Sequence, residues 1–128
     1  MVETRGSLRS GFKTKVVFSV DDSMKKQIHL AKDKFEAYTA DISTLGIGIL
    51  SNHFIPKGAI LNAEIDGANF SLDEPLRIKC EVRYCNFVKM GEYRSGMKFL
   101  DILPLYKDKI AEFIKKNERR EVPRFKVP

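Results

Sequence analysis

Ile78-Lys79-Cys80-Glu81-Val82-Arg83-Tyr84 is the most regular stretch of the sequence, with apolar side chains at every second position and charged ones between them. Successive side chains of a β-strand point to opposite faces of a sheet, so this period predicts a strand with one buried face. Five further stretches are rich in β-branched and aromatic residues and predict strands of the same kind. They are residues 15–20, 35–40, 47–50, 60–65 and 93–99.

After Asp101 the apolar spacing changes from two residues to that of a helix. The residues that follow this spacing are Ile102, Leu105, Tyr106, Ile110, Phe113 and Ile114. They predict one amphipathic helix over residues 103–117, in which Pro104 has to lie in the first turn. Strands without intervening helices disfavour a parallel βαβ fold. The chain is therefore predicted to be mostly β, an antiparallel barrel or sandwich with a C-terminal α-helix.

The chain has 128 residues, of which 43% are hydrophobic, and this is enough for one domain with its own core. We expect a flexible N-terminal segment over residues 1–13, the barrel with its helix over 14–117, and an arginine-rich tail over 118–128. Residues 21–34 fit either a short helix capped by Ser23 or a loop with extended ends.

The formal net charge of +6 favours anionic partners, which include nucleotides, nucleic acid and membrane surfaces. No apolar run approaches the roughly 20 residues of a transmembrane helix. The N-terminal residues lack the apolar region of a signal peptide. We therefore expect a cytoplasmic protein without a membrane span.

The cysteines and histidines do not form a pattern of metal ligands or catalytic groups. Cys80 and Cys85 are five residues apart in one predicted strand, which places them on opposite faces and argues against a disulfide. His29 and His53 are isolated in the sequence. We expect no metal site, no nucleophilic catalysis and no enzymatic activity.

Asp41-Ile42-Ser43-Thr44-Leu45-Gly46 joins two predicted strands and carries short polar side chains. Gly46 permits a positive φ or a close backbone approach. One interpretation is a turn in which Asp41 and Ser43 bond to local backbone N–H groups. The other is a ligand site at the end of a strand.

Arginines cluster near both ends of the chain. Arg119, Arg120 and Arg124 lie in the tail, and Arg5 and Arg9 lie in the N-terminal segment with the same spacing of four. A guanidinium group can form two parallel hydrogen bonds to guanine or to phosphate. A solvated terminus that keeps the protein soluble is the alternative for each cluster.

The segment from Asp41 to Gly46 resembles the (D/N)xSxxG motif of PilZ domains. The stretches around Gly58, Cys80–Tyr84 and Gly96-Met97-Lys98-Phe99 are similar to later strands of that family. The resemblance implies a six- to seven-stranded PilZ-type β-barrel with a closing helix. It also implies a receptor for cyclic di-GMP, with no other cofactor.

The family's RxxxR motif usually precedes the first strand. Arg5 and Arg9 have this position, whereas Arg119, Arg120 and Arg124 match the motif better and follow the helix. The quality of the motif favours the tail, folded over its own barrel or over a neighbouring subunit of a homodimer. The alternative is that Arg5 and Arg9 bind the ligand.

The resemblance implies a role for each motif residue. Arg120 and Arg124 would bind guanine edges and phosphates, and Arg119 would add charge or stack on a base. Asp41 would accept hydrogen bonds from guanine N1–H and N2–H, Ser43 would bond a base or a phosphate, and Gly46 would avoid a clash with the ligand. The ordered arginine segment would then signal to a partner protein.

Two other functions remain open from the sequence. One is a PilZ-like adaptor that binds proteins and no nucleotide. The other, less favoured, is a small basic barrel that binds nucleic acid through exposed aromatic residues. Five aromatic residues are candidates for such stacking, although the core is the expected place for most of them. They are Tyr38, Phe70, Tyr84, Phe87 and Tyr93.

Overall fold

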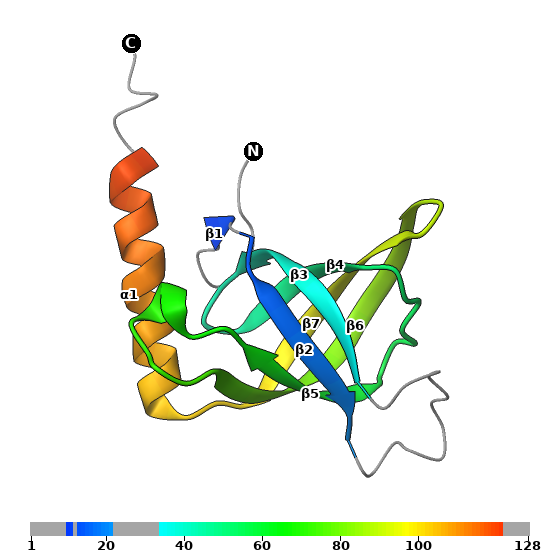
Figure 1. Cartoon of the computed structure of the whole chain (residues 1–128), viewed down its shortest axis with the longest axis horizontal. Helices are drawn as coiled ribbons and strands as arrows, with labels where there is room; N and C mark the ends of the chain where they lie inside the picture. The colour runs from blue at the N-terminus through cyan, green and yellow to red at the C-terminus, as the bar shows by residue number, and fades with distance from the viewer. Residues whose placement is uncertain (1–9, 12, 22–33, 122–128) are drawn as a thin grey trace.

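The computed structural model describes residues 10–11, 13–21 and 34–121, which form one antiparallel sheet and one long helix (Figure 1). The strands are β1 (Ser10–Gly11), β2 (Lys15–Val20), β3 (Lys34–Ile42), β4 (Gly46–Ser51), β5 (Ile60–Ile65), β6 (Leu76–Lys89) and β7 (Glu92–Asp101). A 3-10 turn, η2 (Ala68–Phe70), follows β5, and α1 (Pro104–Glu121) follows β7.

Six of the seven strands close into a barrel. The sheet runs β3-β2-β5-β6-β7-β4, and β4 pairs back to β3. Each neighbouring pair is antiparallel. The short β1 pairs with the last two residues of β3, with Ser10 opposite Ile42 and Gly11 opposite Asp41. Closure of the sheet confirms the predicted six- to seven-stranded antiparallel barrel.

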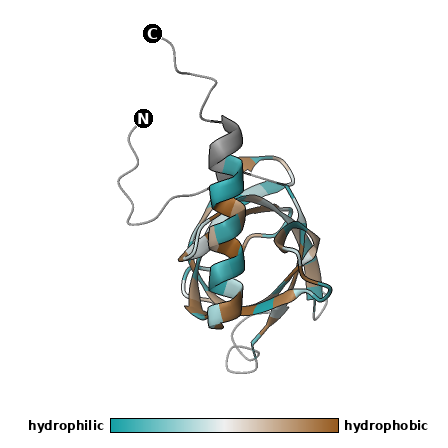
Figure 2. Ribbon diagram, turned by 90° about the vertical axis from the view of Figure 1, so that its left-hand side faces the viewer, coloured by the Kyte–Doolittle hydropathy of each residue, from teal (hydrophilic) through white to brown (hydrophobic). Residues whose placement is uncertain are grey.

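The core lies inside the barrel and beneath α1. Alternate residues of β2, among them Val16 and Phe18, are fully buried, which is the period expected of a strand with one apolar face. Helix α1 lies across one side of the barrel, as Figures 1 and 2 both show. Ile110 of α1 is fully buried, and the ring of Phe113 packs 5.1 Å from that of Phe70 in η2.

Among several register shifts in the sheet, one in β3 and one in β6 reverse the inward and outward alternation on the outer face near the β3–β4 turn. In β3, Thr39 pairs with Ile49 and Asp41 pairs with Gly48, so Ala40 is an extra residue. The side chain of Thr39 therefore faces the core, and the side chain of Asp41 faces outward instead of inward.

The second bulge is at Arg83 of β6, because Val82 pairs with Met97 and Tyr84 pairs with Gly96. Val82 is buried whereas Tyr84 is exposed, so the predicted alternation ends at Val82. The same bulge turns Cys85 toward the core, where it packs beside the cluster that contains Cys80. The prediction that the two cysteines lie on opposite faces was wrong for this reason.

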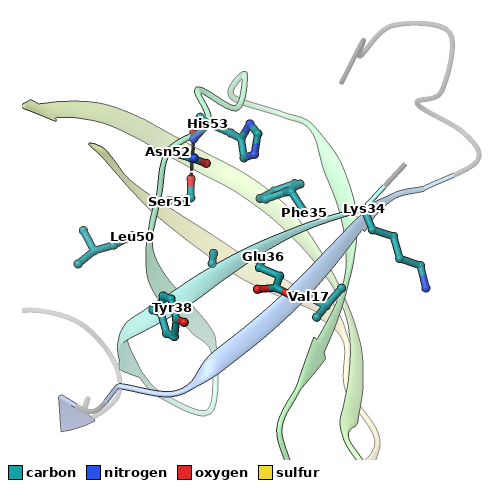
Figure 3. Close-up of a pocket in the computed structure, with 10 residues that line it drawn as sticks. Val17, Lys34, Phe35, Glu36, Tyr38, Leu50, Ser51, Asn52 and His53 are labelled. Carbon is teal, nitrogen blue, oxygen red and sulfur yellow. Dashed lines mark hydrogen bonds between the residues drawn. The ribbon is translucent and has the colours of Figure 1, made fainter. Parts of the chain in front are cut away.

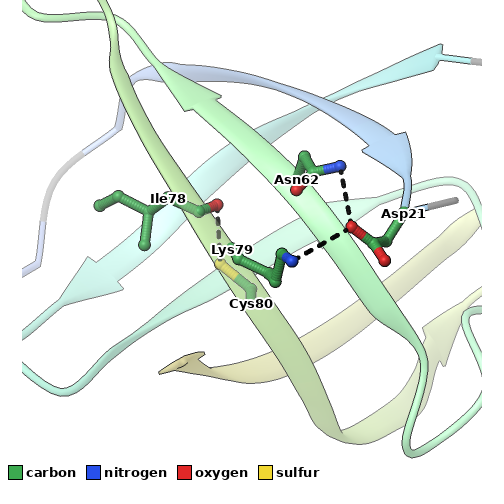
Figure 4. A network of polar contacts seen from close by, with 5 residues as sticks. All are labelled: Asp21, Asn62, Ile78, Lys79 and Cys80. Atoms are coloured by element: carbon green, nitrogen blue, oxygen red, sulfur yellow. Dashed lines mark hydrogen bonds and ion pairs between the residues drawn. The ribbon is translucent and has the colours of Figure 1, made fainter. Parts of the chain in front are cut away.

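A small polar network joins three strands on the outside of the barrel (Figure 4). Asp21 directly follows β2, and its Oδ1 accepts a hydrogen bond from Asn62 Nδ2 at 3.5 Å and lies 3.5 Å from Lys79 Nζ. Asn62 belongs to β5 and Lys79 to β6. The network therefore holds the end of β2 beside its neighbours.

The predicted elements agree with the structure except near the two ends. All six predicted strands are present, and Pro104 is the first residue of α1, as its ring requires. The helix runs to Glu121, four residues beyond its predicted end at 117. Ser10 and Gly11 form β1, where irregular chain was expected. Of the stretch 21–34, predicted as either a short helix or a loop, residues 22–33 lie outside the described part of the chain, and Lys34 is the first residue of β3.

The environments of the two cysteines predict different reactivity. Cys80 is fully buried, and burial raises its pKa to about 12, so almost no reactive thiolate forms near neutral pH. Cys85 is partly exposed. We expect a thiol reagent to label one equivalent in the native protein and a second only after denaturation. Cys85→Ser should remove the native reaction, and native labelling of that variant would contradict the burial of Cys80.

Candidate functional site

The turn between β3 and β4 is organised by Ser43. Its Oγ accepts hydrogen bonds from the backbone N–H groups of Leu45 at 3.1 Å and Gly46 at 3.2 Å, and its own N–H donates to the carbonyl of Gly46 at 2.9 Å. Ser43 is fully buried. Its observed role is thus to hold the turn, and a direct bond from Ser43 to a ligand stays a prediction.

Gly46 is needed because two strands approach each other closely. A Cβ atom at this position would collide with the backbone carbonyl of Met97 in β7. Among the described glycines, positive φ angles occur at Gly58 and Gly91 and not at Gly46. Close backbone approach, and not a positive φ, therefore explains the glycine at this position.

A row of four paired residues crosses the outer face of the barrel. Asp41 of β3 pairs with Gly48 of β4, Gly48 pairs with Gly96 of β7, and Gly96 pairs with Tyr84 of β6. Residues directly opposite each other on neighbouring strands share a face. The two central glycines leave a shallow trough on this face, in which the ring of Tyr84 lies over Gly96 and the carboxylate of Asp41 lies over Gly48.

Arg94 of β7 reaches into this trough and binds Asp41. Its Nη2 donates to Asp41 Oδ2 at 2.7 Å, a short charge-assisted bond. Partial burial alone would lower the pKa of Arg94, but the hydrogen bond and the charge of Asp41, with a smaller effect of Tyr84, raise it above its usual value. Arg94 is therefore a permanent cation at the edge of the site.

The trough forms part of a pocket of about 280 Å³ on this face. Its wall contains one carboxylate, that of Asp41, and three cationic side chains, those of Arg83, Arg94 and Lys98. The remaining lining residues are Leu45, Gly46, Tyr84, Gly96 and Met97. An excess of positive charge in a concave site favours anionic ligands.

A larger pocket of about 840 Å³ lies between β3 and the end of β4 (Figure 3). The charged side chains that line it are Lys34 and Glu36, so it has no cationic excess. Glu36 is already paired with Lys15 at 3.1 Å. The residues from Asp41 to Gly46 do not line this pocket, and we therefore assign the candidate site to the smaller one.

The described residues do not contain a cluster of three or more histidine, cysteine or acidic side chains suited to hold a metal ion. Within the same part of the chain, no helix is long and apolar enough to cross a membrane.

The structure brings together some of the predicted site residues and leaves others undescribed. Asp41 and Gly46 line the pocket, and Ser43 supports it from behind. The backbone of Arg119 and Arg120 belongs to the last turn of α1. Arg5, Arg9 and Arg124 lie outside the described residues.

Sequence reasoning did not identify Arg83, Arg94 and Lys98 as site residues, and it considered Tyr84 only as a candidate for stacking on nucleic acid. Gly96, two positions after Arg94, was a signal in the sequence, because a glycine within a strand often marks the close approach of a ligand or of another backbone segment. The register that sets Gly96 opposite Gly48 cannot be read from the sequence, so the row could not be assembled.

Most of the five aromatic candidates for base stacking were expected to lie in the core. Three of them are exposed instead. Phe70 is buried, whereas Tyr38, Tyr84 and Phe87 are exposed. Phe87 packs edge-on against Tyr93 at 5.9 Å near the β6–β7 turn. Lys13 lies 5.1 Å above the ring of Tyr38. Lys13 thus covers one face of the Tyr38 ring, and Phe87 and Tyr93 contact each other.

The sequence matches the PilZ domain family over residues 3–116, which is most of the chain. A barrel closed by six antiparallel strands, followed by a helix, is the fold expected of that family. This chain is therefore a member of the PilZ domain family. No curated protein matches it.

Solved structures with the same fold include three informative relatives. The PilZ domain of YcgR from Escherichia coli with c-di-GMP is 15% identical, with a TM-score of 0.66; the match covers 98% of this chain and all of that one. MotI/DgrA, the inhibitor of motility from Bacillus subtilis, is 12% identical, with a TM-score of 0.73. The match covers 94% of this chain and 54% of that one.

The third relative is MrkH from K. pneumonia in complex with c-di-GMP, which is 16% identical. Its TM-score is 0.69, and the match covers 98% of this chain and 57% of MrkH. This chain thus spans about half the length of MotI and MrkH. At these identities the likeness shows a common fold.

The PilZ family consists of receptors for cyclic di-GMP and related adaptors, and not of enzymes. Family membership confirms the prediction of a PilZ-type barrel.

Substitution of Gly46 tests the close approach between β4 and β7. Gly46→Ala should lower the free energy of unfolding by about 1–3 kcal/mol, because its Cβ meets backbone that cannot move aside easily. Gly48→Ala is the matched control, since the atoms nearest to its Cβ are the ends of the Asp41 and Arg94 side chains and not backbone. Urea unfolding with an unchanged m-value measures both. Equal stability of Gly46→Ala and wild type would contradict this account.

Proposed function

We propose that this chain binds cyclic di-GMP in the pocket of about 280 Å³ and acts as a receptor for it. One observation carries the proposal: the pocket places Asp41 and Gly46 of the DxSxxG segment together with three cationic side chains. The family match and the c-di-GMP complexes of YcgR and MrkH support the choice of ligand.

The chemistry of the pocket matches the two kinds of group in this ligand. A guanine base presents N1–H and N2–H donors side by side, and the two carboxylate oxygens of Asp41, one of which now accepts from Arg94, match that pair. The phosphates are anionic, and Arg83, Arg94 and Lys98 supply positive charge around the trough. No bond is made or broken, so binding itself is the function.

Further arginines from a chain terminus complete the proposed site. The register of β1 supports the N-terminal pair, because Ser10 lies opposite Ile42 and the next residue toward the N-terminus is Arg9. Ser10 and Gly11 thus hold the chain that follows Arg9 beside the last two residues of β3, which lead directly into the β3–β4 turn. This observation shifts the preference from the tail to Arg5 and Arg9.

The tail remains the second source. Arg119 and Arg120 belong to the last turn of α1, and α1 contacts β1. In this second arrangement, Arg124 would bind the ligand of its own chain or of a partner subunit. In both arrangements, the bound ligand orders an arginine-bearing segment over the barrel and creates a surface for a partner protein in the cytoplasm.

Calorimetric titration with cyclic di-GMP tests the proposal and the source of the arginines. Wild type should bind saturably. Arg9→Ala should weaken binding tenfold or more, because a charge-assisted contact contributes about 1.5–3 kcal/mol. Arg124→Ala should have the smaller effect.

Arg77→Ala is the control for these variants, since Arg77 is exposed on β6 and pairs with Glu64 at 3.5 Å, away from the pocket. A larger loss with Arg124→Ala than with Arg9→Ala would restore the tail as the source. Absence of heat from the folded wild type would refute the receptor function and favour a protein-binding adaptor.

A further inference from the structure

We propose that Arg94 is a further ligand-binding residue. In the free protein its guanidinium binds Asp41. When guanine binds Asp41 instead, the guanidinium moves to a phosphate of the ligand. The inference rests on the proposed function. It assigns to β7 a cation outside both arginine clusters and outside the DxSxxG segment.

The contact between the two side chains crosses the trough directly above a glycine. Nη2 of Arg94 lies 2.7 Å from Oδ2 of Asp41. A Cβ atom on Gly48 would lie 2.9 Å from Asp41 Oδ1 and 3.2 Å from Arg94 Nη2. The ion pair thus lies against the backbone of β4, inside the space that the pocket offers to a ligand.

A guanidinium group and the Watson–Crick edge of guanine present the same pattern to a carboxylate. Each offers N–H donors side by side in one plane, and a carboxylate accepts from two of them. Arg94 in its observed position therefore excludes guanine from Asp41. Binding of the base through Asp41 requires the guanidinium to move.

The displaced guanidinium of Arg94 remains within the same pocket. It stays attached to β7, on the pocket wall that also carries Arg83 and Lys98. The Asp41–Arg94 pair is partly open to water, and partly exposed ion pairs are weak enough for a ligand to replace. Once released, the cation meets phosphate in a pocket that holds no other acid.

Substitution of Arg94 distinguishes a side chain that binds the ligand from one that only competes with the ligand for Asp41. Arg94→Met keeps most of the side-chain length and removes the charge, and Arg94→Lys keeps the charge. We expect Arg94→Met to raise the Kd for cyclic di-GMP about tenfold, and Arg94→Lys to raise it less. Arg77→Met is the control and should leave the Kd unchanged, because Arg77 pairs with Glu64 and Glu74 outside the pocket.

An unchanged or lower Kd for Arg94→Met, in a protein whose wild type binds, would overturn this inference and leave the proposed function intact. Lack of binding by wild type would overturn both.

The transfer itself is visible by NMR in the wild-type protein. The Nε–Hε signal of Arg94, identified by its loss in Arg94→Lys, should shift on titration with cyclic di-GMP. A cation that only stabilises the barrel would keep its contact with Asp41, and its signal would not move. An unshifted signal at saturation would therefore also overturn the inference. This test uses the wild-type protein, so it holds even if Arg94→Met is unstable.

Discussion

The outward turn of Asp41 depends on one extra residue in β3, and the rest of the site depends on that turn. A regular strand would continue the inward positions of Phe35, Ala37 and Thr39 to residue 41 and bury the carboxylate in the core. The bulge at Ala40 instead sends Asp41 to the surface and returns Ile42 to the interior. An unpaired carboxylate in an apolar core is strongly unfavourable, so this irregularity serves both stability and function.

The second bulge, at Arg83 in β6, has the corresponding effect at the other end of the row. It exposes Tyr84 above Gly96, and the two bulged strands then enclose β4 and β7, each of which contributes a glycine to the row. Bulges commonly redirect side chains next to functional sites. In this PilZ domain they produce a trough with an acid at one side, an aromatic ring at the other and cations around it.

The sequence predicted the elements well and the site only in part, and the difference has a physical cause. Period and turn chemistry identify strands such as β2 and β5 because both depend on neighbouring residues alone. A bulge is a mismatch between two strands, so neither Ala40 nor Arg83 reveals it in the sequence. The misplaced faces of Tyr84 and Cys85, and the omission of Arg94 from the site, all follow from this single limit.

Chemical-shift mapping of cyclic di-GMP on the backbone amides tests the central claim most directly, because it asks where the ligand lies. The account predicts that the largest changes fall on the residues around Asp41, Gly48 and Gly96, with β6 near Tyr84 and the β3–β4 turn. Changes centred instead on Phe35, Ser51 and His53, in the larger pocket, would contradict it.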